Sequence, residues 1–228
     1  MGAKLKVVED PLFAGFYSLP DAARLLGQQN TQKIRGWLSG WNNGQPILLR
    51  DFEDPQTVSF LDLIELRFVD FFRSQGVPLQ TLRKAAERAR KDWDTTHPFA
   101  LSDVKYMTDR RKVFAQAAEA QKDKVTWDMA TGQTEMWAAI ESVVAQGVVF
   151  DPRTALAKKW TPRAGFSNVI VDPRIAFGKP IVESTMVPTK TLYRQWKADQ
   201  SYESVAEWFK VDVAAVKSAV MFEIAMAA

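Results

Sequence analysis

The sequence predicts a mainly α-helical protein with small β elements, an α+β fold class. Apolar residues recur at the three- and four-residue spacing of amphipathic helices in several stretches, and Ser, Thr or Asp precedes many of these as a potential N-cap. A shorter β-branched segment bounded by turn residues, Val169–Val171, indicates an isolated strand. With 228 residues, 46% of them hydrophobic, and with 8 Trp and 14 Phe, the chain can bury a core in each of two domains.

Composition also excludes several classes of site. The chain has no Cys and a single His, so disulfides and thiolate metal centres are excluded, and we expect no metal and no cofactor. The first residues lack the apolar run of a signal peptide, and the most apolar stretch, Val143–Phe150, is too short to span a membrane. We therefore expect a cytoplasmic protein with no membrane partner. The formal net charge of +3 permits a nucleic-acid partner without demanding one.

The first predicted helix runs from Ser18 to Gly27. Ser18 is a good N-cap, Pro20 fits the first helical turn, and Asp21 completes a pattern that resembles a capping box. Gly27 suits the left-handed conformation that ends many helices. These signals predict a short helix with a tight stop.

A second short helix is expected to begin after Thr31, its predicted N-cap. Ile34, Trp37 and Leu38 share one helical face and would pack against the first helix. The side chains left facing outward are those of Gln32, Lys33, Arg35 and Ser39. Two helices joined in this way form a helix-turn-helix, whose second helix can enter a major groove. The same hairpin can also serve purely as a packing unit.

Charge around this unit favours the nucleic-acid interpretation. Between Ala22 and Arg50 the chain has four basic residues and no Asp or Glu. An acid-free surface favours association with the dense negative charge of a duplex. Residues 40–46 contain two Gly and one Pro and indicate a turn, which would lead into a strand at Ile47–Leu49. Turn and strand together would form a wing.

The segments Tyr17–Gly27 and Ile34–Leu38 resemble the opening of MerR-like winged-helix regulators, in which the second helix occupies the major groove. The resemblance implies that Arg35 contacts a phosphate and that Trp37 lies close to the DNA backbone. MerR regulators continue into a long dimerisation helix and an effector domain, and this chain does not. The candidate DNA-binding residues are Thr31, Gln32, Lys33, Arg35, Trp37, Ser39, Asn42 and Asn43.

Two longer helices are predicted next. Ser59 and Asp62 form a capping box before a strongly apolar helix over residues 60–72, whose Phe-rich face we assign to the core. Pro78 then opens a helix with five basic residues and a single acid, Glu87, between positions 83 and 91. The basic residues are Arg83, Lys84, Arg88, Arg90 and Lys91. This face is either a phosphate-contacting surface or a solvated exterior.

The remaining middle segment is expected to be β-rich and non-catalytic. The lone His97 is interpreted as a hydrogen-bonded structural residue. Two β-hairpins are predicted, one over residues 104–114 and one over residues 125–137, each with a polar turn at its centre. Phosphate-binding Gly loops, nucleophile elbows and metal-ligand clusters are absent from the sequence, so we expect no catalytic residues and no enzymatic activity.

The C-terminal segment is predicted to contain a strand and a second helix-turn-helix. Val169–Val171 is the strand, and a helix is expected after Pro188. Ser201 and Asp212 would cap two further helices, which form the second helix-turn-helix. The last helix carries one basic residue, Lys217, which favours contact with protein over contact with DNA.

The C-terminal segment resembles a widespread prokaryotic antitoxin domain. The positions that match its pattern are Asp172, Pro173, Gly178, Pro180, Thr185, Val187 and Pro188. The chain departs from the pattern at Ser184, where Gly is usual, and at Met186, where Arg is usual. Together with the N-terminal half, this segment resembles a subgroup of VapB-type antitoxins along nearly the whole chain.

This resemblance implies an antitoxin that binds double-stranded operator DNA, represses its own operon and neutralises a cognate toxin, a PIN-domain ribonuclease. It implies a homodimer as well, since operator symmetry mirrors protein symmetry. The expected domains are a MerR-like winged helix-turn-helix over residues 1–100, a β-hairpin-containing connector over 101–165, and an antitoxin-type domain over 166–228. The alternatives are a stand-alone MerR-like transcription regulator without a toxin, and a protein-interaction module whose helix-turn-helix units only pack.

Overall fold

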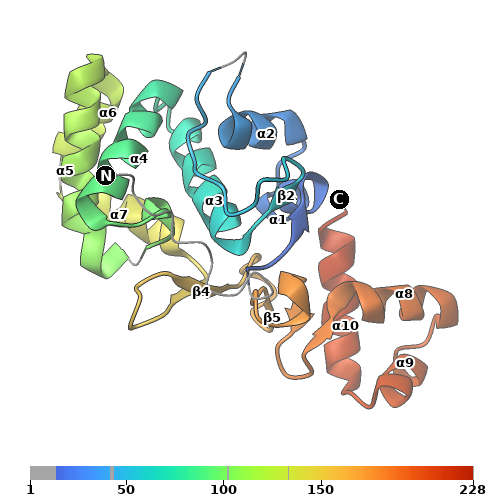
Figure 1. Ribbon diagram of the computed structural model, residues 1–228. Coiled ribbons are helices and arrows are strands. Elements are labelled where there is room, and N and C mark those ends of the chain that lie inside the picture. The colour runs from blue at the N-terminus through green and yellow to red at the C-terminus, as the bar shows by residue number, and fades with distance from the viewer. Residues whose placement is uncertain (1–13, 42–43, 102, 133, 228) are drawn as a thin grey trace.

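The computed structural model describes residues 14–41, 44–101, 103–132 and 134–227. Within these ranges the chain forms ten α-helices and seven short strands in three small antiparallel sheets, which confirms the predicted fold class of mainly α with small β elements. Figure 1 shows the N-terminal and middle helices in one larger body, with the C-terminal helices beside it at the lower right. Within the same ranges, no helix has the length and apolar character needed to cross a lipid bilayer.

The elements follow one another in three groups along the chain. The N-terminal group consists of β1 (Tyr17–Ser18), α1 (Leu19–Leu26), α2 (Thr31–Ser39), β2 (Thr57–Val58), α3 (Phe60–Ser74) and α4 (Leu79–Trp93). The middle group consists of a 3-10 helix η2 (Pro98–Ala100), α5 (Asp103–Gln121), α6 (Lys124–Thr131), α7 (Thr134–Ala145), β3 (Val148–Phe150) and β4 (Ala157–Trp160). The C-terminal group consists of β5 (Val169–Ile170), η3 (Ala176–Gly178), β6 (Ile181–Val182), β7 (Val187–Pro188), α8 (Thr189–Asp199), α9 (Tyr202–Phe209) and α10 (Val213–Ala225).

Helices α1 and α2 are two short helices in contact with each other, at the positions where a helix-turn-helix was predicted. The Ser18 hydroxyl caps α1, and Gly27 ends it in the left-handed conformation with a φ of 69°, both as predicted. The N-cap of α2 is Asn30, whose side chain accepts a hydrogen bond from the Gln32 amide. Thr31 was the predicted cap and is instead the first residue of the helix. Asn30 and Thr31 are adjacent, and both residue types can cap a helix, so the sequence leaves the first residue of α2 uncertain by one position.

The strand predicted at Ile47–Leu49 is wrong. These residues lie in a loop, and β1 pairs instead with β2. Ile47 and Leu48 are consecutive and both buried, at 1% and 0% exposed, whereas successive side chains of a half-buried strand point to opposite faces. The Ile47 amide donates a hydrogen bond to the Trp37 carbonyl, which holds the loop against the end of α2.

An aromatic cluster forms the centre of the larger body. The predicted capping box of Ser59 and Asp62 is present at the start of α3, and the Phe-rich face of this helix is buried as predicted. The Phe68 ring stacks on Phe99 with 4.2 Å between ring centroids. The other rings of the cluster are Phe72, Phe114 and Trp137. Packing of these rings unites α3, η2, α5 and α7.

The two hairpins predicted at 104–114 and 125–137 are wrong, because these residues form α5, α6 and α7. Within α5, Val113, Phe114 and Ala117 are buried at helical spacing. Gly132 donates its amide to Asp128 and ends α6, where a hairpin turn was expected. A hairpin does occur in the 101–165 segment, but it is formed by β3 and β4.

The C-terminal segment contains a three-stranded antiparallel sheet in the order β5-β6-β7, followed by three helices. Pro188 precedes α8, and Ser201 caps α9, both as predicted. A small core of its own lies between the sheet and these helices, with Val182, Leu192 and Val216 each 0% exposed. This core supports α9 and α10 as a helical pair.

Several contacts join the C-terminal segment to the larger body. Glu223 of α10 is 4% exposed and pairs with Arg24 of α1, with 2.9 Å between Nη1 and Oε2. The Thr189 hydroxyl at the start of α8 donates to the same carboxylate. Gly178 lies so close to β1 that a Cβ atom there would be 2.2 Å from the Tyr17 hydroxyl oxygen. The larger core also includes Phe222 of α10, so the two parts pack directly against each other.

Candidate nucleic-acid interface

The outer face of α2 is polar and exposed. Ile34, Trp37 and Leu38 are buried at 0%, 3% and 1% exposure and fix the helix against the core. The exposed side chains are those of Gln32, Lys33, Arg35 and Ser39, the four predicted to face outward. Since the buried face is well packed, the exposed face is presented on a rigid helix.

The structure places the other candidate residues differently. Trp37 is 3% exposed and belongs to the large core, so its indole is not part of the outer face. Thr31 is half-buried at the first position of α2. Asn42 and Asn43 lie outside the described residues.

Two of the four basic residues of the acid-free stretch are used inside the protein. Arg24 pairs with Glu223 of α10, a contact that spans 199 positions of the sequence. Arg50 donates to the Ser39 hydroxyl and to the carbonyls of Asp54 and Thr57. Lys33 and Arg35 are exposed on α2, so they carry the positive charge of its outer face.

The loop after α2 is held by arginines of the basic helix α4. Arg83 donates to the Gln45 carbonyl at 3.1 Å, and Arg90 donates to the Ile47 carbonyl at 2.6 Å. The sequence left two interpretations of α4 open, a phosphate-contacting face or a solvated exterior. Two of its five basic residues bind this loop, and two more, Lys84 and Arg88, pair with acids of their own helix. Most of this positive charge is therefore used within the protein.

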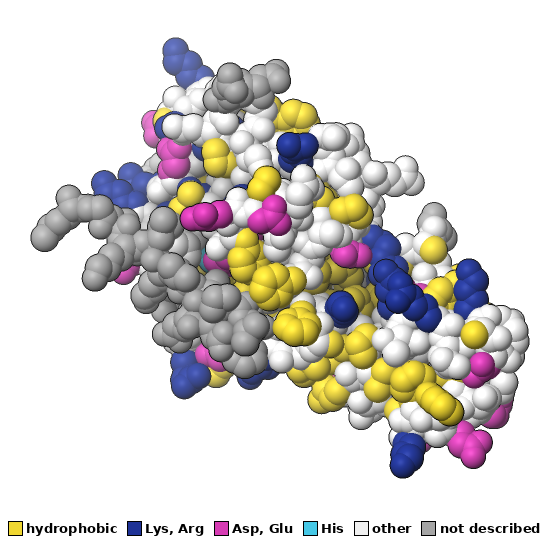
Figure 2. All heavy atoms as spheres, turned by 45° about the vertical axis from the view of Figure 1, so that its right-hand side comes forward, with side chains coloured by type: hydrophobic (Ala, Val, Ile, Leu, Met, Phe, Trp, Pro, Cys, Tyr) yellow, Lys and Arg dark blue, Asp and Glu magenta, His cyan; other side chains and the backbone are white. Residues whose placement is uncertain are grey.

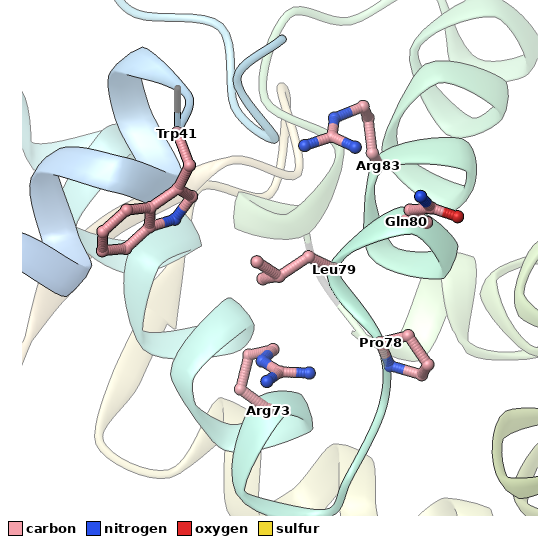
Figure 3. Close-up of a pocket in the computed structure, with 6 residues that line it drawn as sticks. All are labelled: Trp41, Arg73, Pro78, Leu79, Gln80 and Arg83. Carbon is pink, nitrogen blue, oxygen red and sulfur yellow. The ribbon is translucent and has the colours of Figure 1, made fainter. Parts of the chain in front are cut away.

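A surface hollow lies where α2, α3 and α4 meet, and Figure 3 shows the residues that line it. Trp41 forms one wall, and its indole packs against α2 so closely that a Cβ atom at Gly36 would lie 2.0 Å from the ring. Arg73 and Arg83 lie on the other sides and donate to the carbonyls of Val77 and Gln45. Trp41 therefore packs on α2, and the two arginines that line the hollow have backbone carbonyls as partners.

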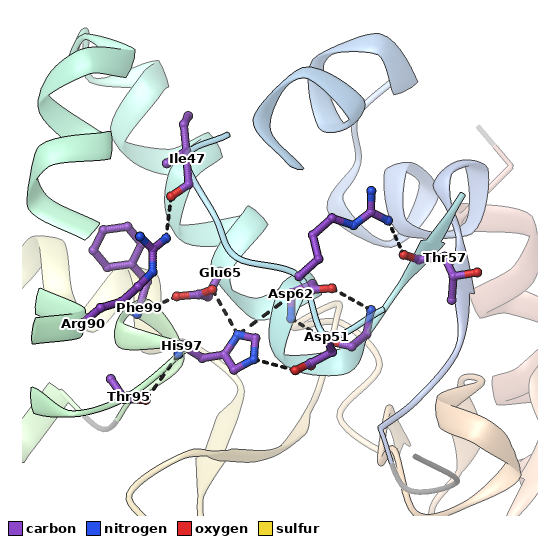
Figure 4. A network of polar contacts seen from close by, with 11 residues as sticks. Ile47, Asp51, Thr57, Asp62, Glu65, Arg90, Thr95, His97 and Phe99 are labelled. Atoms are coloured by element: carbon purple, nitrogen blue, oxygen red, sulfur yellow. Dashed lines mark hydrogen bonds and ion pairs between the residues drawn. The ribbon is translucent and has the colours of Figure 1, made fainter. Parts of the chain in front are cut away.

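A buried polar network also holds this loop, through His97 and Asp51 (Figure 4). His97 is 3% exposed, and its Nε2 lies 2.9 Å from Asp51 Oδ1 in the loop. Its Nδ1 lies 3.2 Å from Glu65 Oε2 on α3, and the other Glu65 oxygen accepts the Phe99 amide. The interpretation of His97 as a hydrogen-bonded structural residue is confirmed. Neighbouring residues in the sequence do not reveal its partners, which lie 32 and 46 positions away.

The electrostatics of this network favour a charged imidazolium. Burial alone would lower the pKa of His97, but its hydrogen bonds to Asp51 and Glu65, together with their charges, raise the pKa to about 10. Burial raises the pKa of Asp62 to about 6, although the charge of His97 opposes this shift. Asp51, Asp62 and His97 could offer three metal-ligand atoms within 4.8 Å of one another. Each ring nitrogen of His97 lies within hydrogen-bond distance of a carboxylate, Asp51 at Nε2 and Glu65 at Nδ1.

Comparison with known proteins gives three findings. A family model described as "Protein of unknown function (DUF433)" matches residues 169–222. Over 215 residues the chain is 23% identical to "Putative antitoxin VapB45" of Mycobacterium tuberculosis (strain ATCC 25618 / H37Rv), a match that covers 86% of this chain and 88% of that protein. The X-ray crystal structure of Rv2018 from Mycobacterium tuberculosis has a similar fold, with a TM-score of 0.65, 24% identity, and coverage of 93% of this chain and 98% of that chain. These findings support an antitoxin-like protein.

Proposed function

We propose that this protein is an antitoxin that binds operator DNA through α1 and α2, represses its own operon and neutralises a PIN-domain ribonuclease toxin. The observation that carries the proposal is the rigid outer face of α2, which is polar, basic and free of acidic residues. Similarity along most of the chain to a protein named as an antitoxin supports the same assignment. In this proposal residues 1–100 bind DNA, residues 101–165 connect, and residues 166–228 form the antitoxin-type domain.

The DNA-binding part of the proposal follows helix-turn-helix geometry. The recognition helix of such a unit lies in the major groove, and the first helix crosses the sugar-phosphate backbone. We assign these roles to α2 and α1, as in MerR-like regulators. A homodimer would place two copies of α2 on symmetric half-sites.

The toxin-binding part rests on the C-terminal helices. Trp208 of α9 is 76% exposed, and Met221 and Ile224 of α10 are 59% and 49% exposed. Figure 2 shows hydrophobic side chains exposed on the lower-right lobe. Large exposed apolar side chains are typical of surfaces that bind another protein. We assign these exposed side chains of α9 and α10 to the toxin-binding part of the protein.

The Arg35→Ala variant tests the DNA-binding part. Because Arg35 is proposed to contact a phosphate, its loss should weaken binding to every sequence and reduce the slope of log affinity against log salt by about 1. Fluorescence anisotropy with the native promoter, across a range of salt concentrations, measures both quantities. Arg153→Ala is a matched control, since this arginine has an 89% exposed side chain in the β3–β4 turn. An unchanged slope in Arg35→Ala would remove Arg35 from the interface, and equal affinity for promoter and scrambled DNA would overturn operator recognition.

Growth of a permissive host tests the toxin-binding part. The reading frame next to this gene is expressed alone and then together with this protein. We expect growth arrest in the first case and normal growth in the second. The antitoxin role would be contradicted if neither of the two reading frames that flank this gene causes growth arrest. Promoter binding by this protein, with no arrest from either frame, would instead support a stand-alone regulator.

A further inference from the structure

A basic cleft of about 220 Å³ lies between α1 and α8. Its charged lining residues are Asp21, Arg24, Lys179, Lys190, Arg194 and Glu223. Figure 2 shows Lys and Arg side chains gathered beside the hollow between the upper body and the lower-right lobe. The cleft is thus formed jointly by the first helix-turn-helix and the C-terminal segment.

Charge in this cleft is unbalanced. Glu223 is neutralised by Arg24, with which it forms a largely buried ion pair. Within the described part of the chain, the side chains of Lys179, Lys190 and Arg194 form no ion pair and no hydrogen bond, and all three residues are exposed. They therefore face a single further carboxylate, that of Asp21, which accepts a hydrogen bond from a neighbouring hydroxyl. The cleft has a net positive charge and suits an anion.

Helix α8 arranges its basic residues on one side. Lys190, Arg194 and Lys197 follow the four- and three-residue spacing that places side chains on one helical face. All three are exposed, and the only acid of this helix, Asp199, is its last residue. Helix α10 has a single basic residue, Lys217, so α8 has more positive charge than the last helix of the chain.

We propose that this cleft binds phosphates of the duplex DNA backbone, beside the groove that α2 enters. The proposal rests on the proposed function, because it takes α1 and α2 as the DNA-binding helices. With α2 in the major groove, α1 lies over the backbone, and the cleft adjoins α1. Glu223 pairs with Arg24 of α1 and accepts a hydrogen bond from Thr189 of α8, so this one carboxylate holds the two helices next to each other. Helices α1 and α8 can therefore contribute to the same phosphate-binding surface.

The double variant Lys190→Ala/Arg194→Ala tests this assignment. Loss of two phosphate contacts should reduce the slope of log affinity against log salt by about 1.8 and lower affinity at ~0.1 M salt on the order of 10- to 100-fold. Specificity for the promoter over scrambled DNA should persist, since phosphate contacts carry no sequence information. The control variant Lys112→Ala/Arg153→Ala removes the same charge from side chains that are 70% and 89% exposed on α5 and in the β3–β4 turn. We expect this control to retain the wild-type slope.

The outcomes separate this proposal from the proposed function. A wild-type slope in the double variant, with Arg35→Ala still weakening binding, would overturn the phosphate cleft and leave DNA binding by α2 intact. Equal effects of the double variant and its charge-matched control would also overturn it, because the effect would then reflect net charge alone. If wild-type protein does not bind duplex DNA, both proposals fail. Calorimetry with inorganic phosphate provides another arm, because binding of free phosphate that the double variant loses, without a change in the DNA slope, would overturn the duplex as ligand.

Discussion

Replacing His97 with alanine is expected to lower the free energy of unfolding by about 3–5 kcal/mol, the loss typical of a buried ion pair deprived of one partner. The imidazole is 3% exposed and lies between Asp51 of the loop and Glu65 of α3. Without it, these carboxylates and Asp62 would share a buried site with no imidazolium between them. Urea unfolding, compared with the wild type at about pH 7, measures the change.

Two comparisons make this prediction specific. Lys112→Ala, at a 70% exposed position, should change stability by less than about 0.5 kcal/mol. Adding Asp62→Asn to His97→Ala should recover part of the loss, because it removes one carboxylate charge from the same site. A loss below about 1 kcal/mol in His97→Ala would mean that the imidazole is neutral or that the site hydrates readily.

The pH profile provides a second measurement on the same variant. A group whose folded pKa is raised contributes stability that is complete below its unfolded pKa and lost as pH rises through its folded pKa. For His97 these values are 6.5 and about 10, so wild-type stability should fall from about pH 7 to about pH 9.5. Asp62, raised from 3.8 to about 6, contributes a loss in the same direction at lower pH. His97→Ala should lack most of the fall above about pH 7, and an equal fall in both proteins would contradict the charged imidazolium.

Replacing Phe68 with alanine is expected to cost about 3–5 kcal/mol of stability, because it removes a large ring from a packed interior. The side chain is 0% exposed and stacks on Phe99. Phe72 lies on another side, with 4.5 Å between ring centroids, so truncation leaves a cavity lined by rings from three elements. Thermal or urea unfolding measures the loss.

Trp208→Ala is the matched control for Phe68→Ala. Trp208 is 76% exposed, so its truncation should change stability by less than about 0.5 kcal/mol. A similar loss in both variants would contradict the assignment of Phe68 to the structural centre. A small loss in Phe68→Ala alone would mean that the neighbouring rings collapse into the space.

Local signals in the sequence predicted the ends and faces of the helices well. Ser18, Gly27 and Ser59 cap their helices through partners that lie within a few residues of each in the sequence. The buried and exposed faces of α2 likewise follow from helical spacing alone. For these reasons the fold class and the outer face of α2 could be predicted.

Features that depend on distant contacts could not be predicted. The hairpins expected at 104–114 and 125–137 were predicted from local turn residues. These segments are helical instead, and Phe114 of α5 and Trp137 of α7 pack together in the aromatic cluster. The burial of Trp37, the partners of His97 and the pairing of Arg24 with Glu223 involve residues far apart in the chain. No spacing rule within one segment contains that information.

Arginine side chains bind backbone carbonyls of the loop between α2 and β2, at Gln45, Ile47 and Asp54. Every residue type supplies a carbonyl oxygen, so a substitution at these acceptors leaves the hydrogen bond in place. The donors Arg50, Arg83 and Arg90 have no such freedom, because a guanidinium is needed to reach and bind these carbonyls. Sequence divergence in this loop is therefore expected mainly at its exposed positions, whereas Ile47 and Leu48 are constrained by burial and Asp51 by its contact with His97. The path of the loop past α2 would be preserved by these residues together with the arginines that bind its carbonyls.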